Sequence, residues 1–592
     1  MKKFDLSKII SLDTFLSLIF GAVVFVFFAF LYPFHLNYQE QYQLFLYTSD
    51  YFLDFFGKPG GIANYLGTFV TQFYFYSKIG ALIIAFILTF LQRVIYSASQ
   101  KLEAKSFWIP ITFVPSLLYW NLFCDENYLA GGMIAMLLLA ASINGYIRIN
   151  STKWRIVSAL FLIPVLYWGI GGAFLFFTLF TIANELIKNE IDKKQVLVFS
   201  AAITVLSLIL PLIAKAIFLQ YPMGKFWVGV NYFRYPVNVP LSVGIVALLI
   251  FFIPLLLYFF SKKISIPKTH YILFVQLVII GVGGFSFIRN SADFSKEEVM
   301  AYDFHTRMRK WDRIIALADK SNPTSPLSVT CLNLALAKQD LLSNQMFSYY
   351  QNGTAGLIPD FIRDFTIPMM AGEVYYHLGL VNTAQRFAFE AMEALPDYQK
   401  SARTIKRLAE TNIINGDYEV AKKYLNILKK TLYYRSWAKH TLEQIKDESL
   451  ISEHIEWGWL RKVRIDKDFL FSEAEKENML GLLFTHNPEN QMAFDYLMAI
   501  CLLNKDLQHF VNFYPLSKSL DYKVIPKTYQ EALIYIWELT NNDPTKKISY
   551  PVSDEATKRL HNYKRIYSTT RDAKSLNKDF GDTYWYYLHF NK

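Results

Sequence analysis

The stretch Cys124-Asp125-Glu126-Asn127-Tyr128 places two adjacent carboxylates between two apolar runs, Phe107–Phe123 and Gly131–Ile147. Each run is about long enough to cross a bilayer as a helix. A charged side chain is costly at membrane depth, whereas it is tolerated at the membrane surface. The stretch therefore predicts two transmembrane helices joined by a very short loop, with both acids at a membrane surface.

Similar apolar runs follow one another on both sides of this loop and stop near residue 288. Residues 289–592 have the composition of a charged, soluble helical protein. We therefore expect an all-α chain: a polytopic membrane helical bundle over residues 1–288, followed by a soluble α-helical solenoid over residues 289–592. Length and hydropathy predict about nine spans, the fifth and sixth being short enough to form a re-entrant pair instead: 13–32, 78–97, 107–123, 131–147, 156–170, 172–187, 195–217, 241–261 and 270–288.

The net charge of +11 does not by itself indicate nucleic acid, because many of the surplus cations lie in short loops between the predicted spans. We expect no nucleic-acid partner. The three cysteines are far apart and form no CxxC motif, which argues against a zinc module or a disulfide framework. A bridge between Cys331 and Cys501 stays open at this point.

Lys and Arg are concentrated in the segments that would share a side with the N-terminus, where Lys2, Lys3 and Lys8 precede the first apolar run. This run has no small-residue cleavage site and is interpreted as a retained anchor. The opposite side of this half holds only Lys58, Lys78, Lys225 and Arg234, with Lys215 just inside a span. The positive-inside rule then predicts a multi-pass protein of the bacterial inner membrane, with a cytoplasmic N-terminus and a periplasmic C-terminal half.

Three segments on the outer side carry the candidate functional residues. The first, residues 33–76, has two amphipathic pieces typical of interfacial helices and contains His35, Glu40, Asp50 and Asp54. The second is the Asp125-Glu126 loop, and the third, residues 219–240, is aromatic and carries Lys225 and Arg234 between Pro222, Pro236 and Pro240. The simpler alternatives are helices that only seat the protein in headgroups, a solvated turn, and cations that contact lipid phosphates.

This layout resembles the GT-C class of integral-membrane glycosyltransferases, which have a long first outer loop with an acidic residue and a short second outer loop with further acids. The matching positions are Glu40 (or Asp50) in the first loop and Asp125 and Glu126 in the second, although the first loop has no DxD motif. The resemblance implies a polyprenyl-phosphate-linked sugar as donor and a carboxylate as the general base.

The same chemistry needs a fixed cation that stabilises the leaving phosphate. Arg234 and Lys225 are candidates, and Lys58 is a weaker one. A divalent metal ion held by Asp125 and Glu126 is the alternative to direct catalysis by these acids. The pattern leaves both possibilities open, and no cofactor is required by it.

In the C-terminal half, AGEVYYHLGLVNTAQRFAFEAMEALP (residues 371–396) resembles a tetratricopeptide repeat, and LAETNIINGDYEVAKKYLNIL (residues 408–428) follows as a second copy. Small residues at these spacings let the two helices of a hairpin approach closely, and such hairpins stack into arrays that bind peptides or partner proteins. Looser hairpins are expected at residues 311–338 and 496–514.

The two resemblances together match the multi-pass O-mannosyltransferases with luminal repeats. They imply a glycosyl- or oligosaccharyltransferase that moves a sugar from the lipid-linked donor to an exported polypeptide or glycan held by the repeats. The main alternative is a non-catalytic, membrane-anchored repeat scaffold for envelope assembly or secretion. A transporter is disfavoured, because no predicted span carries a clear charge at mid-depth.

Overall fold

A computed structural model describes residues 11–188, 190, 192–217, 222–235, 239, 241–263, 269–397, 399–466, 471–520, 522–541 and 548–591. Regular secondary structure within these ranges is helical, which confirms the predicted class, and the β-type pairing there is a single bridge between Tyr128 and Phe233. Cys124, Cys331 and Cys501 are free and buried, so the bridge left open above is not formed. Five residues named above lie outside the described residues: Lys2, Lys3, Lys8, Pro236 and Pro240.

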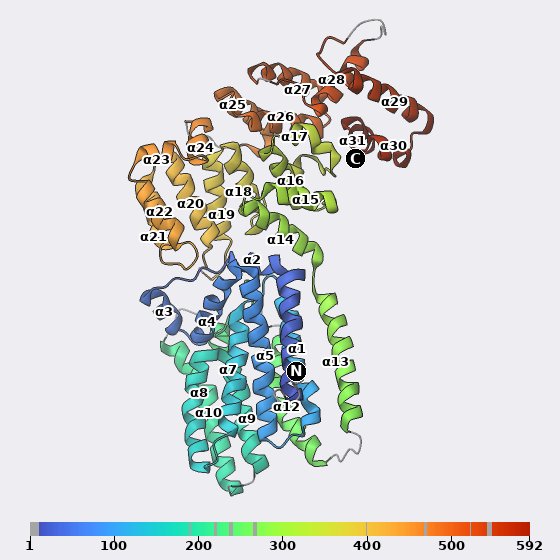
Figure 1. Cartoon of the computed structure of the whole chain (residues 1–592). Coiled ribbons are helices and arrows are strands. Elements are labelled where there is room, and N and C mark those ends of the chain that lie inside the picture. The colour runs from blue at the N-terminus through green and yellow to red at the C-terminus, as the bar shows by residue number, and fades with distance from the viewer. Residues whose placement is uncertain are drawn as a thin grey trace, which may run out of the picture. The chain divides into compact units, whose positions relative to one another are not determined.

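The chain forms two compact units, whose elements are labelled in Figure 1. The first unit is Met1–Glu297 together with the short segments Pro396–Gln399 and Lys430–Tyr433. The second unit is made of the remaining residues up to Lys592. The division thus falls inside a helix that follows the last apolar run.

The first unit is a bundle of long apolar helices joined by shorter ones. Its elements are α1 (Leu12–Val26), the π-helical turn η2 (Phe27–Leu31), α2 (Pro33–Glu40), α3 (Ser49–Phe56), α4 (Gly61–Thr71), η3 (Gln72–Phe75), α5 (Ser77–Lys101), η4 (Ser106–Phe113), α6 (Val114–Phe123), α7 (Ala130–Ile147), α8 (Thr152–Ile170), η5 (Gly171–Ala173), α9 (Phe174–Lys188), α10 (Lys193–Ile217), α11 (Met223–Val228), α12 (Leu241–Lys263), α13 (Thr269–Ser291) and the first turn of α14 (Phe294–Arg307).

Seven helical stretches among the described residues are long and apolar enough to cross a membrane, compared with the nine spans predicted. One difference is the stretch 107–123, which begins as the 3-10 helix η4 and becomes α-helical only at Val114. Pro110 and Pro115 explain this, because proline cannot donate a backbone hydrogen bond inside a helix. The other is the pair near 156–187, which counts as one apolar stretch, Thr152–Lys188.

Within that stretch, Gly171 separates α8 from α9. Its φ of +59° and ψ of −147° lie in a region that side chains rarely adopt. A Cβ at Gly171 would also lie 2.2 Å from the carbonyl oxygen of Val228. Glycine is therefore required here by conformation and by space, and it lets α8 and α9 pack against each other as a hairpin.

The second unit consists of shorter helices. They are the rest of α14, α15 (Trp311–Lys320), α16 (Pro326–Lys338), α17 (Leu342–Gln345), η6 (Met346–Ser348), η7 (Gly353–Gly356), α18 (Thr366–Leu378), α19 (Val381–Glu393), α20 (Ala402–Asn415), α21 (Tyr418–Leu428), α22 (Arg435–Gln444), α23 (Glu448–Ser452), α24 (Trp457–Val463), η8 (Glu473–Glu475), α25 (Lys476–His486), α26 (Gln491–Leu503), α27 (Leu507–Phe513), η9 (Tyr514–Ser519), α28 (Lys527–Thr540), α29 (Asp554–Thr570), α30 (Ala573–Phe580) and α31 (Tyr584–Phe590).

Two hairpins, α18–α19 and α20–α21, pack side by side in this unit. Each first helix ends at a left-handed glycine, Gly379 with φ +93° and Gly416 with φ +85°. Glycine at this position satisfies the last helical carbonyls and turns the chain back at once. Ala384 and Ala421 are fully buried at the equivalent places of the second helices, as close helix packing requires.

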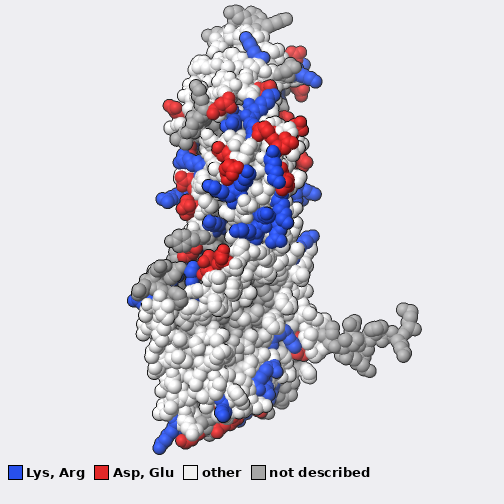
Figure 2. All heavy atoms as spheres, turned by 90° about the vertical axis from the view of Figure 1, so that its left-hand side faces the viewer, with Lys and Arg blue, Asp and Glu red and all other residues white. Residues whose placement is uncertain are grey.

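The surfaces of the two units differ in charge. Figure 2 shows Lys, Arg, Asp and Glu side chains crowded over the helices of the second unit, whereas the long helices of the first unit present an almost uncharged surface in this view. Large apolar side chains such as Phe86, Phe161 and Phe285 are more than 65% exposed on these long helices. An apolar surface of this size is what a helical bundle presents to lipid.

Candidate functional site

The short helix α2 follows the first apolar helix and is buried along its length from His35 to Glu40. Pro33 occupies its first turn, where a missing N–H does no harm. The next two backbone N–H groups, of Phe34 and His35, donate to the Glu297 carboxylate at 2.7 and 2.9 Å. The oxygens of a carboxyl group at a helix N-terminus satisfy these donors.

The Asp125 side chain closes its own turn between α6 and α7. Its Oδ1 accepts from the backbone N–H of Asn127 at 2.8 Å, which is the side-chain turn that aspartate commonly forms. The Asp125 carbonyl oxygen accepts from Nε2 of Gln39, on α2, at 3.0 Å. Burial raises the pKa of the Asp125 carboxyl, against the hydrogen bonds from Asn127.

Glu126 pairs with Lys296, from the first turn of α14. The distance from Lys296 Nζ to Glu126 Oε1 is 2.8 Å, and 16% of the Glu126 side chain is exposed. Burial raises the pKa of Glu126, but the hydrogen bond and charge of Lys296 outweigh it and the net direction is down. Glu126 therefore stays ionised as part of this pair.

The third loop segment is tied to the second by backbone hydrogen bonds around the Tyr128–Phe233 bridge. The N–H of Leu129 donates to the Tyr232 carbonyl at 2.9 Å, and the N–H of Arg234 donates to the Asn127 carbonyl at 2.7 Å. These bonds bring the backbone of Arg234 to the turn that carries Asp125 and Glu126.

The Arg234 guanidinium is held by tyrosines. Nη1 donates to the Tyr38 hydroxyl at 3.2 Å and Nη2 to that of Tyr235 at 3.0 Å. The guanidinium carbon also lies 5.0 Å from the ring centroid of Tyr42 and 4.7 Å from that of Tyr235. Such cation–π contacts fix the orientation of an arginine while preserving its charge.

His35 lies between these elements and is completely buried. Its ring stacks on Tyr32 with 4.7 Å between centroids, and neither ring nitrogen meets a partner in hydrogen-bond geometry. Burial lowers the pKa of His35 to about 4, although the nearby backbone of Asp125 acts in the opposite direction. His35 is therefore neutral at pH 7.

We call the residues His35, Asp125, Glu126, Lys296 and Glu297 the loop cluster. Burial raises the pKa of Glu297 to about 8, in spite of the two backbone hydrogen bonds that it accepts. The cluster thus contains an ionised acid, Glu126, beside a carboxyl group that is largely protonated at pH 7. Two acids with separated pKa values are a feature of acid–base sites.

The predicted site residues are only partly brought together. Glu40 ends α2, directly after Gln39, and is 5% exposed. Lys225 lies elsewhere on the first unit, where its Nζ is 3.3 Å from Asn231 Oδ1 and 2.9 Å from Asp397 Oδ1. Lys58 is exposed in the turn between α3 and α4, the turn whose Gly60 N–H donates to the Tyr167 carbonyl. Asp50 and Asp54 are exposed on α3.

A metal ion held by Asp125 and Glu126 finds no support in this geometry. Asp125 is engaged with Asn127 and Glu126 with Lys296. Over the part of the chain that the structure describes, no three His, Cys, Asp or Glu side chains gather as metal ligands would.

Lys296 and Glu297 were missed by sequence reasoning, and His35 was noted without a role. The available signal was position: Lys296 and Glu297 are among the first charged residues after the last apolar run, on the side where the positive-inside rule puts the Asp125-Glu126 loop. The pairing itself follows from packing of α14 beside α2, which no local pattern encodes.

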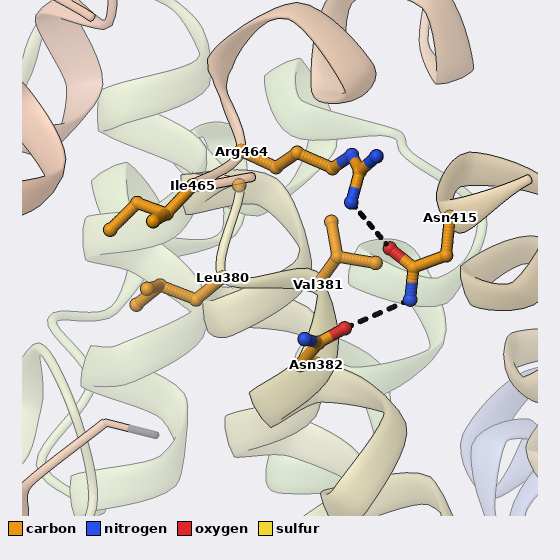
Figure 3. A pocket seen from close by; sticks show the side chains of 7 residues that line it. Leu380, Val381, Asn382, Asn415, Arg464 and Ile465 are labelled. Carbon is orange, nitrogen blue, oxygen red and sulfur yellow. Dashed lines mark hydrogen bonds between the residues drawn. The ribbon is translucent and has the colours of Figure 1, made fainter. Parts of the chain in front are cut away.

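The second unit contains a small hollow between its hairpins, shown in Figure 3. Arg464 Nη1 donates to Asn415 Oδ1 at 3.1 Å, and Asn415 Nδ2 donates to Asn382 Oδ1 at 2.8 Å. Leu380, Val381 and Ile465 also line it. These hydrogen bonds link Arg464, the residue after α24, to α20 and α19, and so brace the hairpins.

Comparisons with known proteins place the chain in a family without adding an activity. No curated protein and no solved structure matches it. Over residues 7–591 the chain belongs to the family described as "Family of unknown function (DUF6057)".

Proposed function

We propose that the chain is a membrane glycosyl- or oligosaccharyltransferase of the GT-C type, which moves a sugar from a polyprenyl-phosphate donor to an exported protein or glycan. The observation that carries the proposal is the convergence of three distant loop segments. Gln39 of α2 binds the Asp125 turn, and Arg234 binds the same turn through Asn127. Segments that carry an acid and a cation are thus held to the same turn.

The transfer step assigns one role to each group. The acceptor hydroxyl oxygen attacks the anomeric carbon of the donor sugar and its proton passes to the Asp125 carboxylate. The bond from that carbon to the phosphate oxygen breaks, and the polyprenyl phosphate leaves with the electron pair. A carboxylate whose pKa is raised by burial is a better base, and Arg234 stabilises the phosphate.

The proposed topology is a multi-pass protein of the bacterial inner membrane. Counting α8 and α9 separately raises the seven apolar stretches to eight, and adding η4–α6 makes nine. An odd number of spans sends the second unit to the periplasm when the N-terminus is cytoplasmic. Arg93, Lys101, Lys153 and Lys194 would then face the cytoplasm.

The second unit is proposed to be a tetratricopeptide-like solenoid that presents the polypeptide acceptor. The adjacent hairpins α18–α19 and α20–α21, each turning at a left-handed glycine, support this. Stacked hairpins of this kind form extended surfaces for peptides or partner proteins.

A second candidate, a non-catalytic scaffold for envelope assembly, is favoured by one specific observation. Both acids of the loop have structural partners: Asp125 closes its turn and Glu126 pairs with Lys296. If the two acids only shape the turn and hold α14, they take no part in a transfer reaction.

The test compares envelope glycoprotein and glycan profiles in a deletion strain complemented with Asp125→Asn, Glu126→Gln or Glu40→Gln. Asp54→Asn, on the exposed face of α3, is the control. We expect Asp125→Asn to lower product by about 100-fold or more, as loss of a general base does, with normal protein levels. Unchanged glycosylation in the deletion strain rejects the transferase. Intact glycans with loss of an envelope complex after removal of residues 298–592 would favour the scaffold.

A further inference from the structure

The turn between α23 and α24, within the second unit, is held by a histidine that the proposed function does not use. Nδ1 of His454 accepts from the backbone N–H of Glu456 at 3.3 Å and from that of Trp457 at 3.2 Å. The His454 ring also stacks on the Trp457 ring, with 3.9 Å between centroids and 14° between planes. Because α24 begins at Trp457, His454 caps N–H groups that find no acceptor inside the helix.

This arrangement fixes the protonation state of the ring. A nitrogen that accepts hydrogen bonds carries no proton, so the neutral imidazole of His454 has its hydrogen on Nε2. The imidazolium ion has a hydrogen on both nitrogens. Its Nδ1–H would be directed at two other N–H donors, and both hydrogen bonds of the cap would be lost. Protonation of His454 and capping of α24 are therefore mutually exclusive.

The turn has little room to adapt to a protonated ring. A Cβ built on Gly458 would lie 2.0 Å from the carbonyl oxygen of Ser452, the last residue of α23. The two short helices thus approach each other through their backbones. The N–H of Gly458 donates to the His454 carbonyl at 2.8 Å, which holds the same residue from its other side. Backbone atoms packed in this way cannot yield as a flexible side chain does.

The charged groups that act on His454 come from three places in the second unit: Glu456 in the same turn, Arg309 after α14, and Glu410 on α20. Burial lowers the pKa of His454 below the usual 6.5, and Arg309 acts in the same direction, whereas the two carboxylates oppose it. A folded ring that binds its proton less readily than an exposed one stabilises the fold fully above about pH 6.5. This stability is lost as the pH falls below that value.

The helix that His454 caps holds the end of a repeat hairpin. Its buried apolar side chains are Trp457, Leu460 and Val463. Arg461 donates from Nη2 to the Ile413 carbonyl at 2.7 Å and from Nε to the Ile414 carbonyl at 3.1 Å, at the end of α20. Arg464, directly after α24, lines the hollow of Figure 3. Loss of α24 would therefore remove one wall of this hollow and the acceptor-side cap of α20.

We propose that His454 is an acid-sensitive helix cap: a proton on Nδ1 releases the start of α24 and, with it, the contacts that α24 makes at the end of α20. The shape of the hairpin region then depends on the pH of the compartment that holds the second unit. This inference applies to a transferase and to a scaffold alike. A ring that only filled space between α23 and α24 would not have an unprotonated nitrogen directed at two N–H groups.

The experiment follows hydrogen exchange of peptides from residues 448–463 in the full chain in detergent, at about pH 7.5 and about pH 5.5, on either side of the pKa of an exposed histidine. Rates are divided by the intrinsic exchange rate at each pH, so that they report local opening. Peptides from α26, a buried helix of the same unit, report whether the fold is intact. The test variant is His454→Asn, because asparagine caps helices without titrating. The matched control is His440→Asn, exposed on α22.

We expect local opening of residues 448–463 to rise several-fold on acidification in the wild type and in His440→Asn, with about tenfold per pH unit as the upper limit. His454→Asn should open equally at both pH values. His454→Ala lacks the acceptor and should open several-fold more than the wild type already at about pH 7.5, with no further rise on acidification.

Unchanged opening of the wild type on acidification overturns the proposal. The same acid response in His454→Asn also overturns it, because the response would then belong to another group, such as the buried His377. If exchange in α26 shows that His454→Asn does not fold, the wild type and His454→Ala decide: slow exchange of His454→Ala at about pH 7.5 would show that the ring does not hold α24. None of these outcomes depends on the transferase activity.

Discussion

Glu297 lies at the contact of two elements: it begins the buried part of α14 and accepts the first two N–H groups of α2. Burial opposes its charge, whereas the N–H donors favour it, and burial prevails. The carboxyl group therefore holds α2 in place mainly in its protonated form at neutral pH. This makes the junction after the last apolar helix sensitive to pH.

We predict that the thermal midpoint of the full chain in detergent falls as the pH rises from about 7 to about 9. The pKa of Glu297 is about 8 in the folded state and near 4.5 when exposed. Its stabilising contribution is thus complete below the unfolded pKa and lost as pH rises through the folded one, at about 1.4 kcal/mol per pH unit. Glu297→Gln should flatten this slope.

The control for this prediction is the exposed neighbour Glu298→Gln, which should keep the wild-type slope. His35 opposes this slope only below its unfolded pKa of 6.5, where the exposed imidazole binds a proton that the buried ring does not, so the measurement stays above about pH 7. The ion pair of Glu126 and Lys296 titrates outside the measured range, since the shifts of both groups stabilise their charged forms. A slope identical in all three proteins would remove Glu297 from this role.

At the scale of elements, the crossing of α4 and α7 depends on two glycines. A Cβ built on Gly67 would lie 2.3 Å from the backbone nitrogen of Gly131. Backbone atoms in a packed bundle cannot yield as a flexible side chain does. The two helices approach closely because neither carries a side chain at the crossing, the arrangement that small residues give membrane helices.

Gly67→Ala should therefore destabilise the first unit by about 1–3 kcal/mol, the usual range for overpacking. Gly145→Ala, on the same α7 but with open space around its Cβ, should be neutral or stabilising by up to about 1 kcal/mol, because alanine is the better helix former. Thermal midpoints in detergent measure both. Equal loss from the two variants would mean that helix geometry, not the crossing, was disturbed.

A second element-level feature is the charged clamp between α8 and α9. Arg155 and Glu185 are fully buried and make two hydrogen bonds of 2.8 and 2.9 Å, while the Tyr146 hydroxyl donates to Glu185 at 2.9 Å. Arg155 lies in the first turn of α8, two residues after the exposed Lys153. Packing of three helices, not hydropathy, decides its environment.

Arg155→Leu should lower stability by about 3–5 kcal/mol, because it leaves the Glu185 carboxylate buried without its cation. The double variant Arg155→Leu with Glu185→Leu should recover at least half of that loss, since an apolar pair can replace a buried ion pair. Arg148→Gln, which changes an exposed residue of the same region, is the control. Denaturant titration of all four proteins in detergent distinguishes these outcomes; no recovery in the double variant would contradict the clamp.

At the scale of the whole molecule, the two units have different surfaces. The first exposes apolar helices, while the second exposes many charged side chains. Both contain buried ion pairs: in the second unit, Arg403 contacts Asp303 at 2.8 Å and Glu373 at 3.2 Å. The proposed topology puts this unit in the periplasm.

Labelling with a membrane-impermeant maleimide in intact cells tests that topology. Since Cys124, Cys331 and Cys501 are buried, engineered cysteines on the surface should dominate the signal. Lys558→Cys, exposed on α29, should label rapidly. Lys153→Cys, exposed at the start of α8, should label only after the cells are opened. The reverse result would invert the proposed orientation.

The sequence alone determined the helical class, the change from lipid-compatible to water-compatible composition, and the residues Asp125, Glu126 and Arg234 as candidates. These follow from local quantities: hydropathy, helical period and charge bias. Pro110, Pro115 and Gly171 were also visible, but their effect on the boundaries of η4, α6 and α8 appears only in the folded backbone.

Only the tertiary structure decided what Asp125-Glu126-Asn127 contacts. Lys296 is 170 residues from Glu126 along the chain, and Glu297 reaches α2 across 262 residues. Arg234 joins the same turn, whereas Lys225 and Lys58 do not. Local sequence patterns indicate which residues are charged, helical or buried. Which of these residues contact one another depends on how the helices pack, and helix packing is a long-range property that no short stretch of sequence reveals.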